Sequence, residues 1–189
     1  MRTALIAVSL LSFAVSPATG QDDESGGREE FTAVALSAGG VRSAPVAAQL
    51  EIVIDRWSTT VERERLMATL GKGQRTTLEE LQDLPRVGYV RTPGSLGWSL
   101  HYAHETRGED GGRRIFLATD RPISIAEAID RPRTIEYPFT FIELQVNDAG
   151  EGQGSLSFAT RLTASRDGRF VYLEHWDTPP IRLTQVKRR

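Results

Sequence analysis

Short apolar-rich runs separated by Gly, Pro and Asp recur along most of the chain, and they restrict its fold more than any other feature. Within residues 50–55, Leu50, Ile52 and Ile54 alternate with polar or smaller side chains, which places these three on one face of a strand. Many short strands at close spacing are typical of an antiparallel sheet. The nine runs that we expect to be strands are residues 31–37, 45–57, 86–91, 97–104, 113–119, 137–147, 154–164, 169–176 and 181–186.

A helix is predicted to interrupt the strands after residue 58. Thr59 and Glu62 have the Thr-x-x-Glu spacing of a capping box at the start of a helix. Leu66, Met67 and Leu70 then fall on one helical face. We expect Gly71 to end this helix, because glycine is favoured just after a helical C-terminus.

A second helix is predicted directly after the first. Residues 76–79 (Thr-Thr-Leu-Glu) repeat the capping-box spacing. Leu78, Leu81 and Leu84 form its apolar stripe, and Pro85 ends it. We expect both apolar stripes to pack on the sheet.

These elements predict one β-rich α+β domain over residues 31–189. We expect a mainly antiparallel, twisted β-sheet of about seven to nine strands that forms a barrel or half-barrel. The two-helix segment should pack on this sheet or cap it. Turn residues at 148–152 and 167–168 further predict that residues 137–176 form a three-strand meander.

The first 20 residues have the features of a secretory signal peptide. Arg2 supplies a positive charge, residues 4–15 an apolar core, and residues 18–20 a small-residue site before Gln21. The core is short for a membrane span, although an uncleaved N-terminal anchor is an alternative interpretation. Residues 21–30 are acidic and predict a flexible tether. We therefore expect a periplasmic or secreted protein without a transmembrane helix after the signal peptide.

The composition excludes several classes of protein. The chain has no cysteine, which excludes disulfide scaffolds, Cys-ligated zinc, iron–sulfur clusters and thiol catalysis. Its 23 basic and 25 acidic residues give a formal net charge of -2. Because so small a net charge supplies no strong field, we expect no nucleic-acid partner.

Histidine and serine are the remaining candidates for catalysis or metal binding. His101, His104 and His175 could in principle serve as metal ligands or as a general base. His101 and His104 are an odd number of residues apart, which places them on opposite faces of a strand. Residues 94–97 (Gly-Ser-Leu-Gly) lack the Gly-x-Ser-x-Gly spacing of a nucleophile elbow. We therefore predict no catalytic residue, no metal site and no cofactor.

Arginine and aromatic residues supply the candidates for ligand binding. Arg114 and Arg121 belong to an arginine-rich stretch, and guanidinium groups suit carboxylates and phosphates. The alternative is that these arginines form ion pairs between strands. Trp98, Tyr102 and Phe141 are candidates for the lining of an apolar pocket, with packing in the core as the alternative. Trp98 and Tyr102 have the even spacing that would put them on one face of a strand.

A set of short motifs is spread over residues 48–185. They are Arg56-Trp57-Ser58, Val87-Gly88, Gly97-Trp98, the run from Gly112-Arg113-Arg114-Ile115 to Ala118-Thr119-Asp120-Arg121-Pro122-Ile123, and the run from Tyr137-Pro138-Phe139 to Ile142-Glu143-Leu144. In these motifs the chain resembles a family of uncharacterised secreted bacterial proteins. The resemblance implies export and a bacterial source, and it implies no activity, cofactor or catalytic residue.

We therefore expect an exported, non-catalytic binding or accessory module of the bacterial cell envelope. Its partner would be a small apolar or amphipathic ligand, held in the concavity of the sheet, or an envelope protein. One alternative is an envelope hydrolase built around His101 or His175 with Glu143. Another is a structural protein-interaction module that works through an exposed strand edge.

Overall fold

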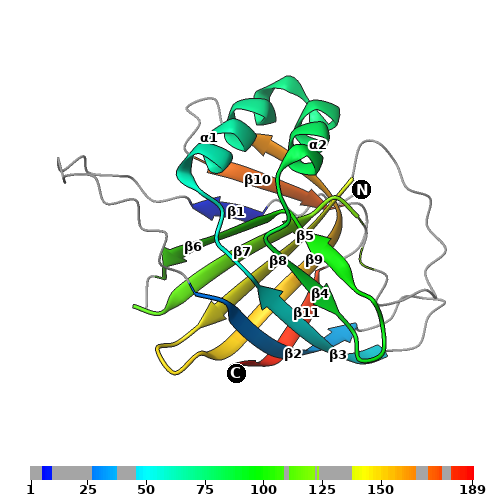
Figure 1. Cartoon of the computed structure of the whole chain (residues 1–189), viewed down its shortest axis with the longest axis vertical. Coiled ribbons are helices and arrows are strands. Elements are labelled where there is room, and N and C mark those ends of the chain that lie inside the picture. Colours follow the sequence, from blue (N-terminus) through cyan, green and yellow to red (C-terminus); the bar gives the residue numbers. More distant parts are fainter. Residues whose placement is uncertain are drawn as a thin grey trace.

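The computed structural model describes residues 6–9, 27–37, 46–108, 111–121, 123, 138–164, 170–175 and 180–189. Within these ranges the strands form one eleven-stranded antiparallel sheet, with two helices packed on it (Figure 1). The strands are β1 (Ile6–Ser9), β2 (Glu29–Ser37), β3 (Val46–Ile54), β4 (Gly88–Arg91), β5 (Trp98–Leu100), β6 (Tyr102–Arg107), β7 (Arg113–Thr119), β8 (Phe139–Val146), β9 (Glu151–Ala164), β10 (Phe170–His175) and β11 (Ile181–Arg188).

Nine of these strands follow one another around a nearly closed barrel, in the order β5-β4-β3-β2-β11-β9-β8-β7-β6. The two ends of this order, β5 and β6, are consecutive in the chain and meet at His101. The backbone N–H of His101 donates to the carbonyl oxygen of Ala118 on β7 at 3.0 Å, which links the two ends. The expected α+β class, with a barrel-like antiparallel sheet and a two-helix segment, is confirmed.

The junction at His101 also changes which face the following residues occupy. We expected one strand over residues 97–104, but β5 ends at Leu100 and β6 begins at Tyr102. Trp98 and Leu100 pack with the cluster inside the barrel, whereas Tyr102 packs with a second cluster outside it. The prediction that Trp98 and Tyr102 share a face is therefore wrong, because the chain passes from one end of the strand order to the other between them.

β9 is the longest strand and changes partners along its length. β8 pairs with it on one side, while β11 pairs with residues 151–156 and β10 with residues 160–164 on the other. Strands β8, β9 and β10 thus form the predicted three-strand meander. β10 also pairs with β1, whose residues belong to the predicted signal peptide.

β2 begins at Glu29, two residues before the expected start of the domain. Glu29 pairs with Ile54 of β3, and its carboxylate binds the guanidinium group of Arg113 on β7 at 2.8 Å. These contacts give the end of the predicted tether a place in the sheet. Residues 21–26 of the tether lie outside the described residues.

The inside of the barrel is filled by side chains that alternate inward along the strands. Leu117 of β7 and Ile142 of β8 are at most 1% exposed. They belong to one continuous cluster to which β2, β3, β4, β9 and β11 also contribute. The concavity in which we expected a ligand is therefore occupied by the hydrophobic core.

The first helix, α1 (Thr60–Thr69), begins as predicted, and a 3-10 turn follows its end. The hydroxyl of Thr59 accepts a hydrogen bond from the Glu62 N–H at 3.2 Å, and the Glu62 carboxylate accepts one from the Thr59 N–H at 2.8 Å. Gly71 occupies the predicted C′ position, because α1 ends at Thr69 with Leu70 as its C-cap, but the chain then continues through it in the 3-10 turn η1 (Leu70–Lys72). Gly73 instead has the positive φ, +108°, that glycine tolerates best.

The second helix, α2 (Gln74–Asp83), starts earlier than predicted. Gly73 occupies the N-cap position, so the expected capping box at residues 76–79 is not used. Thr77 is buried, and its hydroxyl donates to the carbonyl oxygen of Gly73 at 3.2 Å. The side-chain oxygen of Gln74 accepts from the Leu162 N–H of β9 at 2.8 Å, and this contact ties the start of the helix to the sheet.

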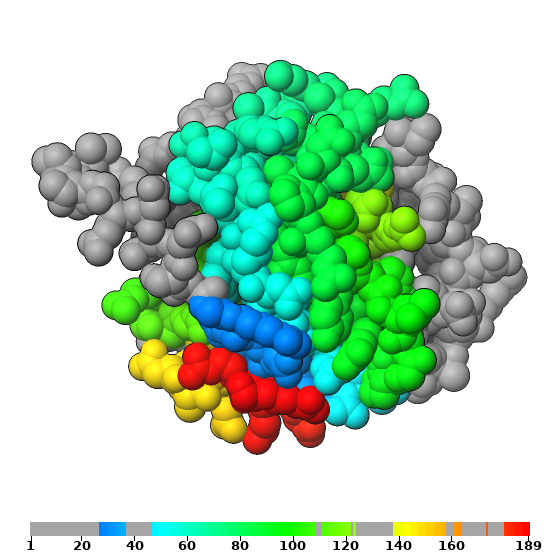
Figure 2. Space-filling model, in the orientation of Figure 1, coloured from blue at the N-terminus to red at the C-terminus, as the bar shows by residue number. Residues whose placement is uncertain are grey.

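The helices lie on the outer face of the barrel wall, beside β6 and β10 (Figure 1). Figure 2 shows them above the strands β2 and β11 on one side of the molecule. A second hydrophobic cluster joins the helices to the wall, and its buried members are Leu66, Leu70, Leu81, Leu84, Ala118, Phe139 and Leu162. The helical pair thus covers the barrel from outside and does not enter it.

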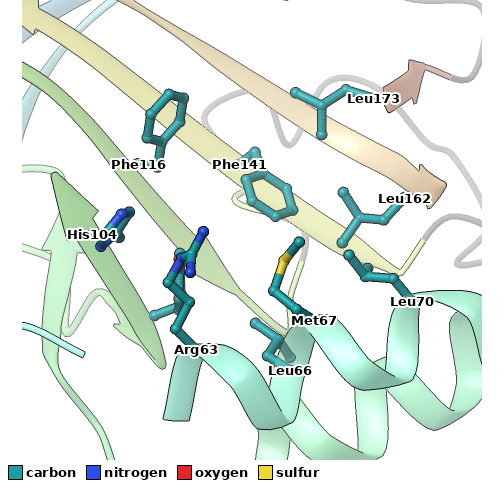
Figure 3. A pocket seen from close by; sticks show the side chains of 10 residues that line it. Arg63, Leu66, Met67, Leu70, His104, Phe116, Phe141, Leu162 and Leu173 are labelled. Atoms are coloured by element: carbon teal, nitrogen blue, oxygen red, sulfur yellow. The ribbon is translucent and has the colours of Figure 1, made fainter. Parts of the chain in front are cut away.

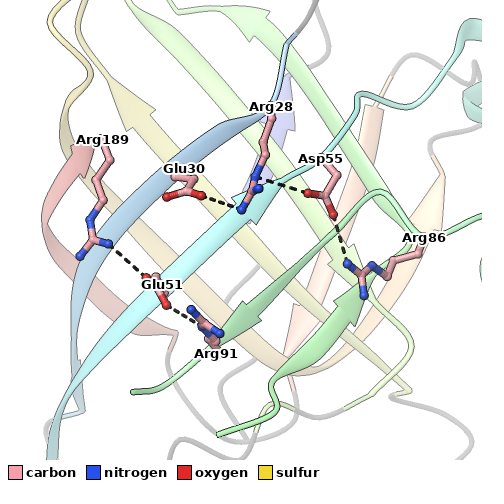
Figure 4. A network of polar contacts seen from close by, with 7 residues as sticks. All are labelled: Arg28, Glu30, Glu51, Asp55, Arg86, Arg91 and Arg189. Atoms are coloured by element: carbon pink, nitrogen blue, oxygen red, sulfur yellow. Dashed lines mark hydrogen bonds and ion pairs between the residues drawn. The ribbon is translucent and has the colours of Figure 1, made fainter. Parts of the chain in front are cut away.

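Another part of the outer surface carries ion pairs instead of apolar residues (Figure 4). Glu51 on β3 lies between two guanidinium groups, 2.5 Å from Arg91 and 3.1 Å from Arg189. Asp55, at the end of the same strand, is 3.2 Å from Arg86. On this face, formed by β2, β3, β4 and the end of β11, arginine and carboxylate groups satisfy one another.

Candidate functional site

A pocket lies between α1 and the outer face of strands β6 to β10 (Figure 3). Its walls are almost wholly apolar, and it is partly open to solvent. The space available to the centre of a water molecule is about 80 Å³. At roughly 10–15 Å³ per water on this measure, that is room for about half a dozen water-sized groups. The lining residues are Arg63, Leu66, Met67, Leu70, Tyr102, His104, Phe116, Phe141, Leu162 and Leu173.

Strand alternation brings the aromatic part of the lining to the outer face. Phe116 precedes the inward-facing Leu117 on β7 and therefore points outward, as Phe141 does on β8. On β6, Tyr102 and His104 are two residues apart and share the same face. His104 is directly opposite Phe116 in the register of the two strands. These four residues form a continuous floor across three neighbouring strands.

One face of α1 forms the roof of the pocket. Arg63, Leu66, Met67 and Leu70 have the i, i+3, i+4, i+7 spacing that places side chains along one side of a helix. The capping box at residues 59–62 fixes where the helix starts, and thereby which residues face the sheet. Leu66 and Leu70 are buried, whereas Met67 is only partly buried because the pocket lies beside it.

Leucines from the last two strands of the wall close the far end of the pocket. Leu162 of β9 and Leu173 of β10 are opposite one another in the strand register. Gln74 at the start of α2 is hydrogen-bonded to the backbone of Leu162, so this end of the helical segment is attached to the same strand. The far end is therefore lined by aliphatic groups held between helix and sheet.

The polar members of the lining are Arg63, Tyr102 and His104, and Arg63 and His104 lie toward the opposite end of the otherwise apolar pocket. Burial raises the pKa of the Tyr102 hydroxyl to about 12, although the charge of Arg63 and a hydrogen bond with it act in the other direction. Burial, and to a smaller extent the charge of Arg63, lower the pKa of His104 below its usual value of 6.5. At pH 7 the phenol is therefore protonated and the imidazole neutral. Arg63 carries the charge of the lining.

Arg63 differs from the other arginines at the start of α1 in its partners. Arg56 binds Glu62 at 2.9 Å, and Arg65 binds Glu80 at 2.7 Å. Arg63 forms no ion pair with a carboxylate in the part of the chain that the structure describes, and its charge acts on the neighbouring Tyr102 and His104. The apolar pocket thus has a cation at one end whose guanidinium group lacks an anion among these residues.

The structure brings two of the predicted ligand-binding residues, Tyr102 and Phe141, into this pocket. Arg114 lies beside it, with its guanidinium carbon 5.4 Å from the centre of the Phe116 ring. The same guanidinium group is 2.6 Å from Glu143 on the neighbouring strand. Arg114 therefore takes part in the interstrand ion pair that was its alternative interpretation.

The other two predicted residues lie elsewhere. Trp98 on β5 packs against the cluster inside the barrel. Arg121 has a side chain that is 67% exposed and lies 4.0 Å from the carboxylate of Asp120. Neither residue lines the pocket.

His101 and Glu143, proposed above as a possible catalytic pair, each contact other groups. The Nδ1 atom of His101 is 3.0 Å from the carbonyl oxygen of Leu84, at the end of α2. Glu143 accepts hydrogen bonds from Arg114 and Gln145. His175 belongs to β10, two residues beyond Leu173. Among the described residues, no group of three or more His, Cys, Asp or Glu side chains could hold a metal ion.

Sequence reasoning identified the apolar part of the helical lining but missed its charged residue. The stripe of Leu66, Met67 and Leu70 was expected to pack on the sheet, and Arg63 was not singled out. Arg63 is one turn before Leu66 and Met67 on the same helical face, so the helical period contained the signal that places it at the pocket. For Leu162 and Leu173, only the strand register could show that they meet.

Comparisons with known proteins identify no relative of this chain. No family model, no curated protein and no solved structure matches the chain. The resemblance to uncharacterised secreted bacterial proteins therefore stays a prediction. Within the described ranges, no helix combines the length and apolar character that a membrane crossing needs.

Proposed function

We propose that this protein is an exported, non-catalytic binding or accessory module of the bacterial cell envelope, which holds a small apolar or amphipathic ligand under α1. The observation that carries the proposal is the apolar pocket between two layers that are otherwise packed together. Pockets for small ligands are mostly lined by apolar and aromatic side chains, with a few polar groups that fix orientation. The lining described above has this composition.

The filled barrel supports this location for the ligand. Its interior side chains form a continuous cluster from β2 to β9, whereas the pocket described above lies on the outer wall. A rigid wall is also a suitable support for a binding site, because strands hold side chains more firmly than loops do. Export follows from the signal-peptide features of residues 1–20 and is part of the same proposal.

The side chains that a hydrolase would need contact other groups, and this favours a binding module over an enzyme. His101 and Glu143 each contact other groups, and the pocket itself contains one imidazole, one phenol and one guanidinium group. The lining has no serine or carboxylate beside that imidazole. It therefore lacks the pairing of nucleophile and base on which most covalent hydrolases rely.

Titration with N-phenyl-1-naphthylamine, a neutral dye that fluoresces in apolar surroundings, tests the proposal. We expect saturable fluorescence enhancement with the protein. Met67→Trp should abolish it by filling the pocket, whereas Ala68→Trp on the exposed side of the same helix should leave it unchanged. Thermal unfolding of both variants checks that each is folded. Absence of saturable enhancement with the unmodified protein, or equal effects of the two variants, would refute the proposal.

A further inference from the structure

We infer that the ligand of this pocket is a single-chain amphiphile with an anionic head group, which binds with its head at Arg63 and its tail between α1 and the strands. The inference rests on the proposed function, because it names the class of ligand for the same pocket. It also specifies how that ligand is oriented in the pocket. The argument uses the distribution of polar groups along the lining, the partners of Arg63 and the size of the space.

The lining changes from polar to aliphatic along its length. Arg63 and His104 lie toward one end in Figure 3, and Leu70, Leu162 and Leu173 lie toward the other. A wholly apolar ligand would leave the polar end without a partner. A polar ligand would in turn leave the aliphatic end in contact with water or polar groups. An amphiphile with one head and one tail satisfies both ends at once.

The sign of the head group follows from the charges around the polar end. Arg63 has five N–H donors, of which the Tyr102 hydroxyl can accept only a part. At neutral pH the adjacent His104 is uncharged, because its pKa is lowered. The nearest carboxylate on β6, Glu105, is bound by Arg113. A carboxylate or similar anion would thus meet a guanidinium group that no described carboxylate neutralises, in a poorly solvated place where attraction between charges is stronger than in water.

The size of the space selects one tail of moderate length. About 80 Å³ for water centres suits about half a dozen chain groups, and the partly open mouth leaves room for the rest of the molecule. Two acyl chains of this length side by side would need about twice that volume. The flexible thioether of Met67 is suited to adjust to tails of different shape.

Competition between matched ligands tests the head group. Decanoate, decanol and decyltrimethylammonium have the same alkyl length and carry a negative, a neutral and a positive head. We expect decanoate to displace the naphthylamine dye at least about tenfold more tightly than decanol, as a charge-assisted hydrogen bond in a desolvated site would give. The cationic amphiphile should bind more weakly than decanol. Equal displacement by decanoate and decanol, or preference for the cation, would overturn the inference.

Substitutions on α1 assign the preference to Arg63. In Arg63→Gln the ratio of decanoate to decanol affinity should fall to about one, because the charge is removed while the apolar lining remains. The matched control is Arg65→Gln, which removes a guanidinium group from the same helix that is paired with Glu80 and does not line the pocket. This control should keep the full preference. A preference that survives in Arg63→Gln, or that is lost equally in Arg65→Gln, would contradict the assignment.

The outcomes separate this inference from the proposed function. If the dye binds and decanoate shows no advantage over decanol, the pocket binds apolar groups and the anionic head group is refuted. If neither the dye nor any of the amphiphiles binds, the proposed function itself fails. Co-sedimentation with phosphatidylglycerol vesicles distinguishes a free amphiphile from a lipid within a bilayer. Sedimentation with vesicles but no binding of decanoate would overturn the inference of a free ligand.

Discussion

Strands β7 and β8 present two apolar faces that are filled to different degrees. On the inner face, Leu117 and Ile142 are at most 1% exposed within a cluster contributed by strands from all around the barrel. On the outer face, Phe116 and Phe141 are only partly buried, and they border the pocket under α1. The same two strands therefore support a closed core on one side and an incompletely filled layer on the other.

The difference shows how closure of a sheet separates stability from binding. A small barrel brings inward side chains from every strand toward one axis, so they fill the space between them. On the outer face, the described residues that pack against β7 and β8 come mainly from the helical segment, and the packing of helix against sheet leaves room beside Met67. We expect changes on the inner face to affect stability and changes at the pocket to affect binding.

The largest effect is expected for a truncation on the inner face. Leu117→Ala should lower the free energy of unfolding by about 2–5 kcal/mol, since it leaves a cavity in a fully buried cluster. Denaturant unfolding measures this loss. Binding of the naphthylamine dye to the folded variant should be unchanged. A loss below about 1 kcal/mol would show that the inner face is less completely packed than the outer one.

Within the helical layer, we expect a fully buried residue to contribute mainly to stability and a pocket-lining residue to contribute mainly to binding. Leu81 of α2 is 1% exposed and does not line the pocket, so Leu81→Ala should lower stability by about 2 kcal/mol or more without affecting the dye. Met67 lines the pocket and is partly exposed, so Met67→Ala should lower stability by less than about 2 kcal/mol and should alter dye affinity. Thermal unfolding and dye titration on both variants measure these effects. The reverse assignment of the two effects would contradict this expectation.

Local patterns in the sequence were sufficient to predict most of the fold. Alternation over residues 50–55 identified β3, and the Thr59 capping box identified the start of α1. The start of α2 was mistaken, because Gly73 and the contact of Gln74 with β9 determine it. The second of these is a tertiary contact, and a capping motif read from the sequence carries no information about it.

The candidate site could be predicted only in part. Tyr102 and Phe141 were identified as aromatic residues at strand positions, yet a period of two does not tell which face of a strand is inside a barrel. The junction at His101 further reversed the relation between Trp98 and Tyr102. The pocket arises from the fit between a helix and the outer wall, and this fit depends on packing that the sequence does not display directly.

The contact that holds α1 above the pocket should be sensitive to acid. A hydrogen bond from Arg56, followed by the backbone N–H of Thr59, lowers the pKa of Glu62 from 4.5, although partial burial opposes this. A carboxyl whose pKa is lower in the folded state stabilises the protein fully above its unfolded pKa, and this stabilisation is lost as the pH falls through the folded value.

Glu62→Gln should therefore make the free energy of unfolding less dependent on pH below about 4.5. Urea unfolding at pH 7 and at several values below 4.5 measures the slope. Glu64→Gln, at an exposed position two residues later, is the matched control and should keep the slope of the unmodified protein. An equal change of slope in both variants would show that the capping contact does not hold this part of the layer.

The smallest effect is expected on the ion-paired part of the outer surface, which lacks the apolar layer found on β7 and β8. Arg28 lies 2.7 Å from Glu30 and 3.6 Å from Asp55, and its side chain is 55% exposed. Exposed ion pairs contribute about 0–1 kcal/mol, and salt screens them over roughly 10 Å at 0.1 M. Arg28→Met should thus lower stability by less than about 1 kcal/mol, and the loss should shrink further in high salt. Urea unfolding at two salt concentrations, together with decanoate and decanol competition, measures both consequences. A change in the preference for decanoate would show that the charge of this face reaches the ligand, and it would remove the distinction between this paired surface and Arg63, which pairs with no carboxylate among the described residues.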